Sequence, residues 1–275
     1  MTARGQRAVA LFCGLGLALL FAAIAAVQVA GWTIGAVERT TSQKLPGPID
    51  QLVVEADGGD ITIVPSLADV VRINSTVKGS IHTPEPHAFR EGNTVHLNGK
   101  CPDISFGPCR ARIMIYVPQG TPVEVHSGSG DLTASGLTGR VDLDTGSGDV
   151  NATGLTGAAN LQTGSGDINV RGLTGTTKLQ SGSGDISGED LGGSVISADT
   201  SSGDVDFAFR WSPTVVEAST ASGDVNIAVP SGDAYRVDAD PGSGDQQIDV
   251  KTDPSADRTI TASTSSGDVT VAYGN

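Results

Sequence analysis

Apolar and polar residues alternate in short runs along most of the chain after residue 48. Examples are QLVVEA at 51–56, DITIVP at 60–65 and ARIMIYVP at 111–118. A period of two, rich in β-branched residues and bounded by Gly, Pro, Asn or Asp, is typical of β-strands. No stretch after residue 37 keeps a helical period, so the pattern predicts an all-β region.

The tripeptide Ser-Gly-Asp divides the second half of the chain into repeats. It ends at Asp131, Asp149, Asp167, Asp185, Asp204, Asp224, Asp245 and Asp268, first at intervals of 18 residues and later at intervals of 19 to 23. A second turn, Gly-Leu-Thr-Gly, starts at residues 136, 154 and 172 with the same spacing. Two strands and two turns in 18 residues make one coil of a stacked repeat.

We therefore predict a parallel β-solenoid of the β-helix or β-roll kind, with coils of about 18 residues. Equivalent strands of successive coils would pair in parallel, about 4.8 Å apart. A flattened, two-sided coil is favoured over a three-sided one, because only two sides show the six-residue leucine spacing that three sides would need. The run DGGDITI near residue 60 resembles one further coil. Residues 49–126 would then be an irregular β region before the repeat solenoid at 127–275, and the handedness stays open.

An uncharged, largely apolar segment spans residues 8–37. About 20 apolar residues suffice to cross a membrane as a helix, and Arg4 and Arg7 before it predict a cytoplasmic N-terminus. We expect a cytoplasmic tail at 1–7, a transmembrane helix or uncleaved signal anchor at 8–37 and a polar linker at 38–48. The protein would be a single-pass cell-membrane protein with its C-terminal domain outside the cytoplasm. A cleaved signal peptide is the alternative, but the apolar region is long for one and lacks a clear cleavage site.

The charge of the chain limits its partners. The net charge is −14, and every acidic residue lies at or after Glu38. This acidic body would repel phosphate groups, so we predict no nucleic-acid partner. Most of the acids are aspartates, which form turns, so the acidity largely reflects turn chemistry.

Two cysteines bracket a short loop in the region expected outside the cytoplasm. The loop CPDISFGPC runs from Cys101 to Cys109 and contains Pro and Gly. Oxidising conditions in exported domains favour disulfides, so we predict one between these residues.

The repeated aspartates are the first candidate site. In stacked coils Asp131, Asp149, Asp167 and Asp185 would form a row, which suggests either calcium binding or a structural role at each turn. Calcium-binding glycine-rich rolls cycle every nine residues and place their aspartate differently. We favour the structural hypothesis, in which each aspartate binds backbone N–H groups of its own turn with help from the preceding serine.

No catalytic constellation emerges from the sequence. There is no G-x-S-x-G motif, the turn serines lack a paired base, and the four histidines form no metal signature. A polysaccharide-lyase β-helix is the enzymatic alternative, but Arg140 and Arg171 occupy different phases of the repeat, so no basic groove is evident. We predict a non-enzymatic protein without a cofactor.

The segment DVDFAFRWSP interrupts the run of small residues. Phe207 and Phe209 share the phase of Val205 and are expected in the core. Trp211, beside Arg210 before a proline, has two interpretations: packing at the end of the core, which we favour, or an exposed contact residue.

The succession IMIYVPQGTPVEVHSGSGDLTASGL at 113–137, followed by the Ser-Gly-Asp coils, resembles the bacterial β-strand-repeat family known as "putative adhesin", a domain of unknown function. The resemblance extends from about residue 51 to the end. It implies a surface β-solenoid, commonly behind one membrane helix, and some similar proteins accompany envelope-stress response systems. It supplies no catalytic residues.

Three functions follow from the sequence. The favoured one is a membrane-anchored surface or adhesion module that binds a cell-wall polymer or a surface protein. The alternatives are an accessory component of an envelope-stress signalling system and a solenoid lyase or hydrolase. The last run, DVTVAYGN, also predicts an open strand edge and self-association through the C-terminal end of the solenoid.

Overall fold

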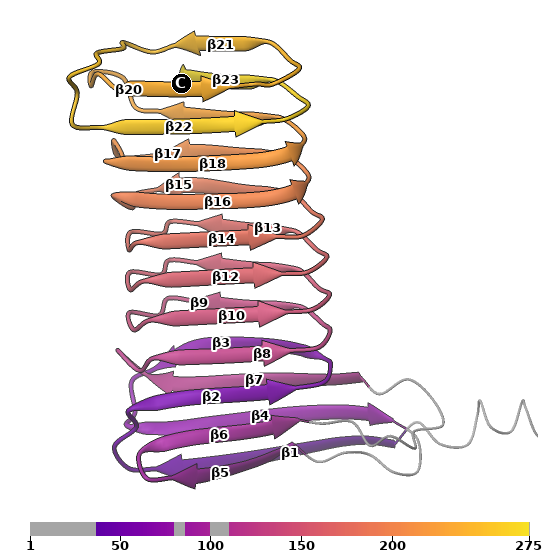
Figure 1. The fold of residues 1–275 in the computed structure, drawn as a ribbon. Helices are drawn as coiled ribbons and strands as arrows, with labels where there is room; N and C mark the ends of the chain where they lie inside the picture. Colours follow the sequence, from indigo (N-terminus) through magenta and orange to yellow (C-terminus); the bar gives the residue numbers. More distant parts are fainter. Residues whose placement is uncertain (1–36, 80–85, 100–109, 275) are drawn as a thin grey trace, which may run out of the picture.

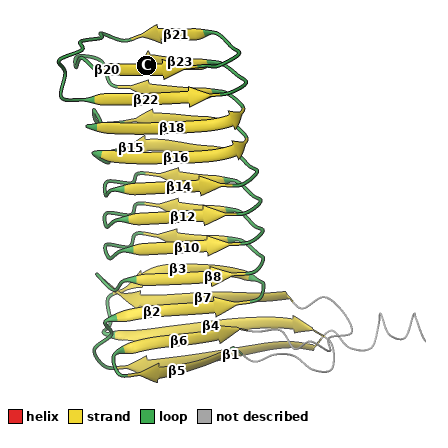
Figure 2. Ribbon diagram, in the orientation of Figure 1, coloured by secondary structure: helices red, strands yellow, loops and turns green. Residues whose placement is uncertain are grey.

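The computed structural model describes residues 37–79, 86–99 and 110–274, and all of its regular elements are β-strands (Figures 1 and 2). They form two sheets that face each other across one apolar core, so the all-β prediction is confirmed. The expected membrane segment at 8–37 ends where the described residues begin. The predicted disulfide between Cys101 and Cys109 also lies outside them.

Sheet A has twelve strands, in the spatial order β1 (Val37–Pro46), β4 (Val70–Gly79), β7 (Arg110–Pro118), β3 (Asp60–Ser66), β9 (Leu132–Ser135), β11 (Val150–Thr153), β13 (Ile168–Arg171), β15 (Ile186–Leu191), β17 (Val205–Phe209), β19 (Val225–Val229), β23 (Val269–Tyr273) and β21 (Gln246–Asp249). Sheet B has eleven strands, in the order β20 (Arg236–Asp240), β22 (Thr259–Thr264), β18 (Val215–Ser222), β16 (Val195–Ser202), β14 (Thr177–Ser181), β12 (Ala159–Thr163), β10 (Val141–Thr145), β8 (Val123–Ser127), β2 (Gln51–Ala56), β6 (Thr94–Gly99) and β5 (His87–Glu91).

Each Ser-Gly-Asp repeat contributes one strand to each sheet. Strands β10 and β12 pair in parallel with Val141 opposite Ala159, and β11 and β13 pair in parallel with Val150 opposite Ile168. Both registers equal one repeat of 18 residues. The prediction of a two-sided, parallel solenoid is therefore confirmed for these coils.

The core is a narrow column of aliphatic side chains between the two sheets. Alternate residues of each strand point inward, as in β12, where Ala159, Leu161 and Thr163 are buried. Leu137, Leu155 and Leu173 of the Gly-Leu-Thr-Gly turns are also buried and close the column at one side. Because each coil buries a similar small set, stability is spread along the stack rather than concentrated at one place.

Chain order and spatial order differ near both ends of the stack. Strands β2 and β3 lie between the β6/β7 coil and the β8/β9 coil, and they pair in parallel with both. This confirms that the DGGDITI segment forms a further coil. At the other end, β22 and β23 lie between the β18/β19 coil and the β20/β21 coil.

The predicted open edge at DVTVAYGN is wrong. This run forms β23, which has a parallel partner on each side, β19 and β21. The outermost strands at this end are β20 and β21, which come earlier in the chain (Figure 1).

The expected linker at 38–48 is also different from the structure. Most of it belongs to β1, which pairs antiparallel with β4 from Val37 to Pro46, and β4 in turn pairs antiparallel with β7. The alternation in VERTTSQKLP is polar on both faces, which is why it resembled a linker. An outermost strand can be held mainly by its backbone hydrogen bonds to the one neighbouring strand, so it does not need a full row of apolar side chains.

Candidate functional site

The Ser-Gly-Asp corners carry a continuous row of hydrogen bonds along the stack. The Asp131 carboxylate accepts the backbone N–H of Asp149 at 3.0 Å, and the Asp149 carboxylate accepts that of Asp167 at 3.0 Å. The same bond links Asp167 to Asp185 and continues through the later coils. Seven of the eight aspartates, all but Asp245 in the outermost coil, therefore bind the next coil rather than their own turn, which differs in detail from the structural hypothesis.

A second row of bonds runs through the same corners, and again the later coil donates to the earlier one. In six of the eight repeats, the buried hydroxyl four residues before the aspartate donates to a glycine carbonyl of the neighbouring coil, as Thr145 does to Gly130 and Thr163 to Gly148. Gly166 has a φ of +154°, and a Cβ there would overlap the Gly148 carbonyl oxygen. The corner motif is thus accounted for by the joining of coils. Across the described residues, no three His, Cys, Asp or Glu side chains are grouped so that they could hold a metal ion.

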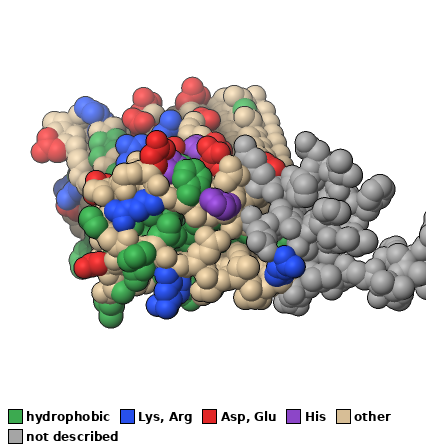
Figure 3. All heavy atoms as spheres, turned by 90° about the horizontal axis from the view of Figure 1, so that it is seen from below, with side chains coloured by type: hydrophobic (Ala, Val, Ile, Leu, Met, Phe, Trp, Pro, Cys, Tyr) green, Lys and Arg blue, Asp and Glu red, His purple; other side chains and the backbone are tan. Residues whose placement is uncertain are grey.

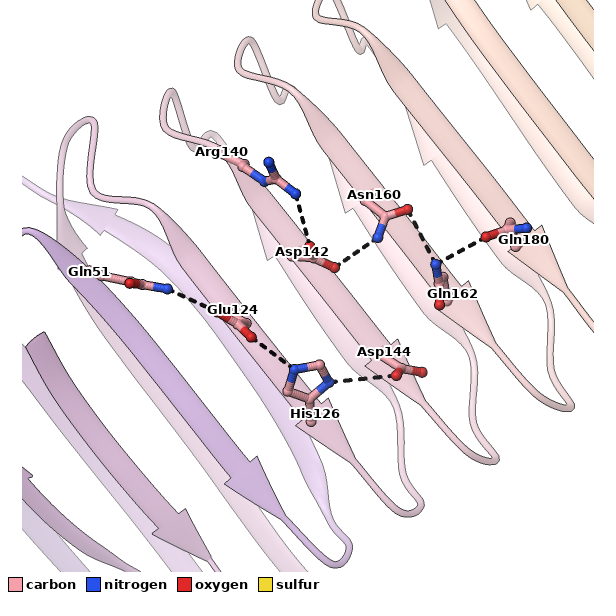
Figure 4. A network of polar contacts seen from close by, with 9 residues as sticks. All are labelled: Gln51, Glu124, His126, Arg140, Asp142, Asp144, Asn160, Gln162 and Gln180. Carbon is pink, nitrogen blue, oxygen red and sulfur yellow. Dashed lines mark hydrogen bonds and ion pairs between the residues drawn. The ribbon is translucent and has the colours of Figure 1, made fainter.

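The outer face of sheet B carries a network of polar side chains, shown in Figure 4. Asp142 accepts hydrogen bonds from Arg140 and from Asn160, and Gln162 donates to both Asn160 and Gln180. Asn160 lies opposite Asp142 and Gln180 lies opposite Gln162, so these two bonds connect neighbouring coils, whereas the other two bonds lie within one coil.

A second, separate group on the same face lies at the first regular coils and includes a histidine. The His126 ring lies 3.0 Å from the Glu124 carboxylate through Nε2 and 3.5 Å from the Asp144 carboxylate through Nδ1. The Glu124 hydrogen bond, followed by that of Asp144, raises the pKa of His126 above its ordinary value, although partial burial opposes this. Gln51 of β2 donates to the other oxygen of Glu124 (Figure 4). The group is exposed and each member has a partner within it, so it joins coils and leaves no unpaired reactive group.

The outer face of sheet A contains a shallow groove that runs across several coils. It consists of two depressions of about 270 and 430 Å³, which share Ser187 and Glu189 as lining residues. One side is a row of polar residues in register on neighbouring strands: Asn151, Asn169, Ser187, Asp206, Asn226 and Thr270. The floor of the larger depression contains Ala208, Ala228 and Ala272, which are also in register.

The groove exists because side chains become small at one position of the repeat. The fourth residue after the aspartate is Ser135, Thr153, Arg171 and Glu189 in the earlier coils; in three of the four later ones it is alanine, and after Asp245 it is Asp249. Neighbouring side chains of the polar row stay longer, so a hollow remains over the alanines. Within it, Asn226 donates to the Asp206 carboxylate at 2.9 Å.

A β-bulge forms the boundary between the two depressions. The register between β15 and β17 shifts between Gly188 and Leu191, and Asp190 has a φ of +52°, which few non-glycine residues adopt. Arg171 pairs with both Glu189 and Asp190. These contacts hold the extra residue of the bulge outward, beside the groove.

The aromatic residues of the segment DVDFAFRWSP lie partly in the core and partly on the surface. Phe207 and Phe209 are buried, as predicted, whereas Trp211 is 63% exposed and the favoured packing interpretation for it is wrong. The Arg210 guanidinium lies 5.7 Å from the centre of the Trp211 ring. Both residues lie close to Ala208 of the groove floor along the chain, with only Phe209 between, so the exposure of Trp211 supports the contact interpretation.

The described part of the chain contains no helix that is long and apolar enough to span a membrane. The expected anchor at 8–37 lies outside that part except for Val37, which begins β1, so membrane attachment stays a prediction.

Comparison with known families fits this architecture. The family model described as Toastrack DUF4097 matches residues 49–272. The chain belongs to the Toastrack family. This confirms the resemblance that the VPQG and Ser-Gly-Asp motifs indicated. No curated protein matches this Toastrack chain.

The solved structures that match this Toastrack chain have low sequence identity to it. A "putative adhesin" from Bacteroides fragilis is 16% identical, covers 85% of this chain and 97% of its own length, and has a TM-score of 0.44. One from Parabacteroides merdae is 12% identical, covers 86% and 97%, and has a TM-score of 0.35. A "putative cell adhesion protein" from Clostridium sporogenes is 11% identical, covers 86% and 100%, and has a TM-score of 0.31.

Sequence reasoning missed the groove, although the sequence held a signal for it. Ala208, Ala228 and Ala272 share one phase of the repeat, and aligning the later coils on their aspartates shows this directly. The signal was obscured because β23 is separated from β19 by an inserted coil, so that Ala272 and Ala228 do not come from consecutive repeats.

Proposed function

We propose that this Toastrack chain is a non-enzymatic surface module, anchored by residues 8–37, whose sheet A groove binds an extracytoplasmic polymer. The observation that carries the proposal is the in-register polar row beside the alanine floor. A ligand with repeating units could meet an equivalent group at each coil, because successive strands lie about 4.8 Å apart.

The chemistry of the groove favours an uncharged, hydroxyl-rich polymer of the kind found in cell walls. The row offers both donors and acceptors, through the amides of Asn169 and Asn226 and the carboxylate of Asp206. The alanine methyls offer a flat apolar surface to the face of a sugar ring. A polyanion would meet the acids of the groove and a net charge of −14, whereas Arg171 is already paired.

An extended peptide fits the groove less well. Peptides bind sheets chiefly by adding a strand to an edge, where backbone groups are unpaired. The groove lies on the face of sheet A, where the backbone bonds of β17, β19 and β23 are already made on both sides. Only side chains remain to bind a ligand there.

The test is co-sedimentation of the full chain, in nonionic detergent micelles, with purified chitin, an insoluble and uncharged polymer of N-acetylglucosamine. Ala228→Gln fills the floor of the groove and should weaken binding at least fivefold. Thr261→Gln places the same side chain on the outer face of sheet B and should bind as the unaltered chain does. Trp211→Ala measures the contribution of the neighbouring aromatic ring. An unaltered chain that stays in the supernatant, or equal binding by Ala228→Gln, would contradict the proposal.

A further inference from the structure

The stack ends at β20 and β21 with one edge of each sheet unpaired. Strand β20 pairs only with β22, and β21 only with β23, among the described residues. The Arg236 N–H binds the Arg258 carbonyl toward β22, so the alternating N–H and C=O groups of Val237 and Ala239 face away from the sheet. Tyr235, just before β20, is covered on this side by bonds to Lys251 and Asp253. The free edge therefore begins at β20 itself.

The apolar core is also incompletely covered at this end. Val237 and Ala239 of β20 and Ile248 of β21 occupy inward positions but are only partly buried. One coil deeper, Ile260 and Val271 are fully buried. An additional layer would thus gain both backbone hydrogen bonds and apolar contact.

The sequence of β20 is complementary to itself in an antiparallel pairing. A two-fold axis through Asp238 places Arg236 opposite Asp240 of a second copy, and the reverse pair forms on the other side of the axis. Val237 then faces Ala239 of the second copy on the inner side. Two oppositely charged pairs outnumber the single Asp238 to Asp238 contact, and cross-strand pairs of opposite charge stabilise a sheet.

We propose that a second copy of this chain docks at the β20/β21 end, with β20 pairing antiparallel with its equivalent to give a symmetric dimer. An isologous contact of this kind closes on itself and stops at two copies. The opposite end of the stack is a poorer partner. The Ala88 N–H at its β5 edge is already bound by Gln43, and Arg90 joins β5 to the carbonyls of Pro46 and Pro48.

Sedimentation velocity of the full chain in density-matched nonionic detergent tests the dimer. The unaltered chain should pass from monomer to dimer as its concentration rises. Arg236→Asp places like charges opposite each other and should weaken the dimer at least tenfold. The double variant Arg236→Asp with Asp240→Arg restores both pairs in swapped order, and should return the dissociation constant to within about threefold of the original.

Controls separate association from folding. Arg140→Asp changes an exposed arginine beside β10 in the same way and should leave the dimer unchanged. Circular dichroism and the urea midpoint show whether Arg236→Asp still folds, and the charge-swapped variant tests the contact even if that single variant is destabilised. A monomer at all concentrations, a dimer insensitive to Arg236→Asp, failure of the swap to restore it, or growth beyond two copies would overturn the proposal.

Discussion

The two ends of the stack differ in how they finish the sheets. At the β1/β5 end the strands turn antiparallel, and the Gln43 side chain bonds the backbone of both Pro86 and Ala88 across the gap between the sheets. Arg90 adds bonds to the carbonyls of Pro46 and Pro48. Figure 3 views the molecule from this end and shows apolar, basic, acidic and histidine side chains mixed on it. At the β20/β21 end the parallel order continues to the last strand.

The difference shows that closure of a solenoid is a local property of its last strands. The central coils present the same parallel edge toward both ends, and only the strands added there decide whether the edge is covered. The β1/β5 end is covered by side chains that bond across it. At the other end, only the shortness of the strands and the charges on β20 hinder pairing with a further strand. Where charge is what hinders pairing, a strand with complementary charges can still pair with the edge.

The strongest test of this comparison uses one valine from each end of sheet B. Val95 of β6 is fully buried and Val237 of β20 is only partly buried, and both occupy the same inward position of their coils. Val95→Ala should lower the free energy of unfolding by about 1.5–3 kcal/mol, and Val237→Ala by less than about 1 kcal/mol. Urea unfolding of the full chain in detergent micelles measures both. Equal losses would show that the two ends are equally covered.

A smaller effect is expected from the glutamine that bridges the closed end. Gln43→Ala leaves the Ala88 N–H and the Pro86 carbonyl without their partner, so we expect a loss of about 1–2 kcal/mol. Gln247→Ala on exposed β21 is the matched control and should change stability by less than about 0.5 kcal/mol. Hydrogen exchange at the Ala88 amide should accelerate only in the first variant. Unchanged exchange there would mean that the edge is protected by something other than Gln43.

The smallest expected effect lies where the irregular end meets the first regular coils. Glu124 and Asp144 raise the pKa of His126 in the folded chain, so its stabilising contribution is complete below its unfolded pKa of about 6.5 and is lost as pH rises through the folded value. His126→Gln should therefore cost more at pH 6 than at pH 8.5. The side chain is half exposed, so the cost should stay below about 1 kcal/mol. A larger cost at the higher pH would contradict the assignment.

The central coils could be predicted from sequence because their sequence neighbours are also their spatial neighbours. The 18-residue repeat predicted the strands, their parallel pairing and the inward positions of leucines such as Leu155 and Leu161, which are buried. The ends could not be predicted in this way, because a coil from another part of the chain lies between consecutive repeats there. This is why β23 was expected at the edge although it lies between two strands.

Single residues at the surface were harder to place for a related reason. A polar strand such as β1 has no apolar row to identify it, and its role depends on β4 and β5, which the local pattern does not contain. The placement of Trp211 likewise depends on another coil, because its ring lies against Gly192, where a Cβ would come within 3.0 Å of the ring. The groove needed three coils in register before its floor could be recognised.

The free edge at β20 and β21 lies at the end of the stack opposite to the start of β1. Strand β1 begins at Val37 at the opposite end of the stack, so whatever holds the chain through that residue lies far from the free edge. Twelve strands at about 4.8 Å make a stack of roughly 50 Å. Two copies joined at their free edges would form a rod of roughly 100 Å with an attachment point at each tip. Such a rod would set the separation between two surfaces instead of lying flat on one.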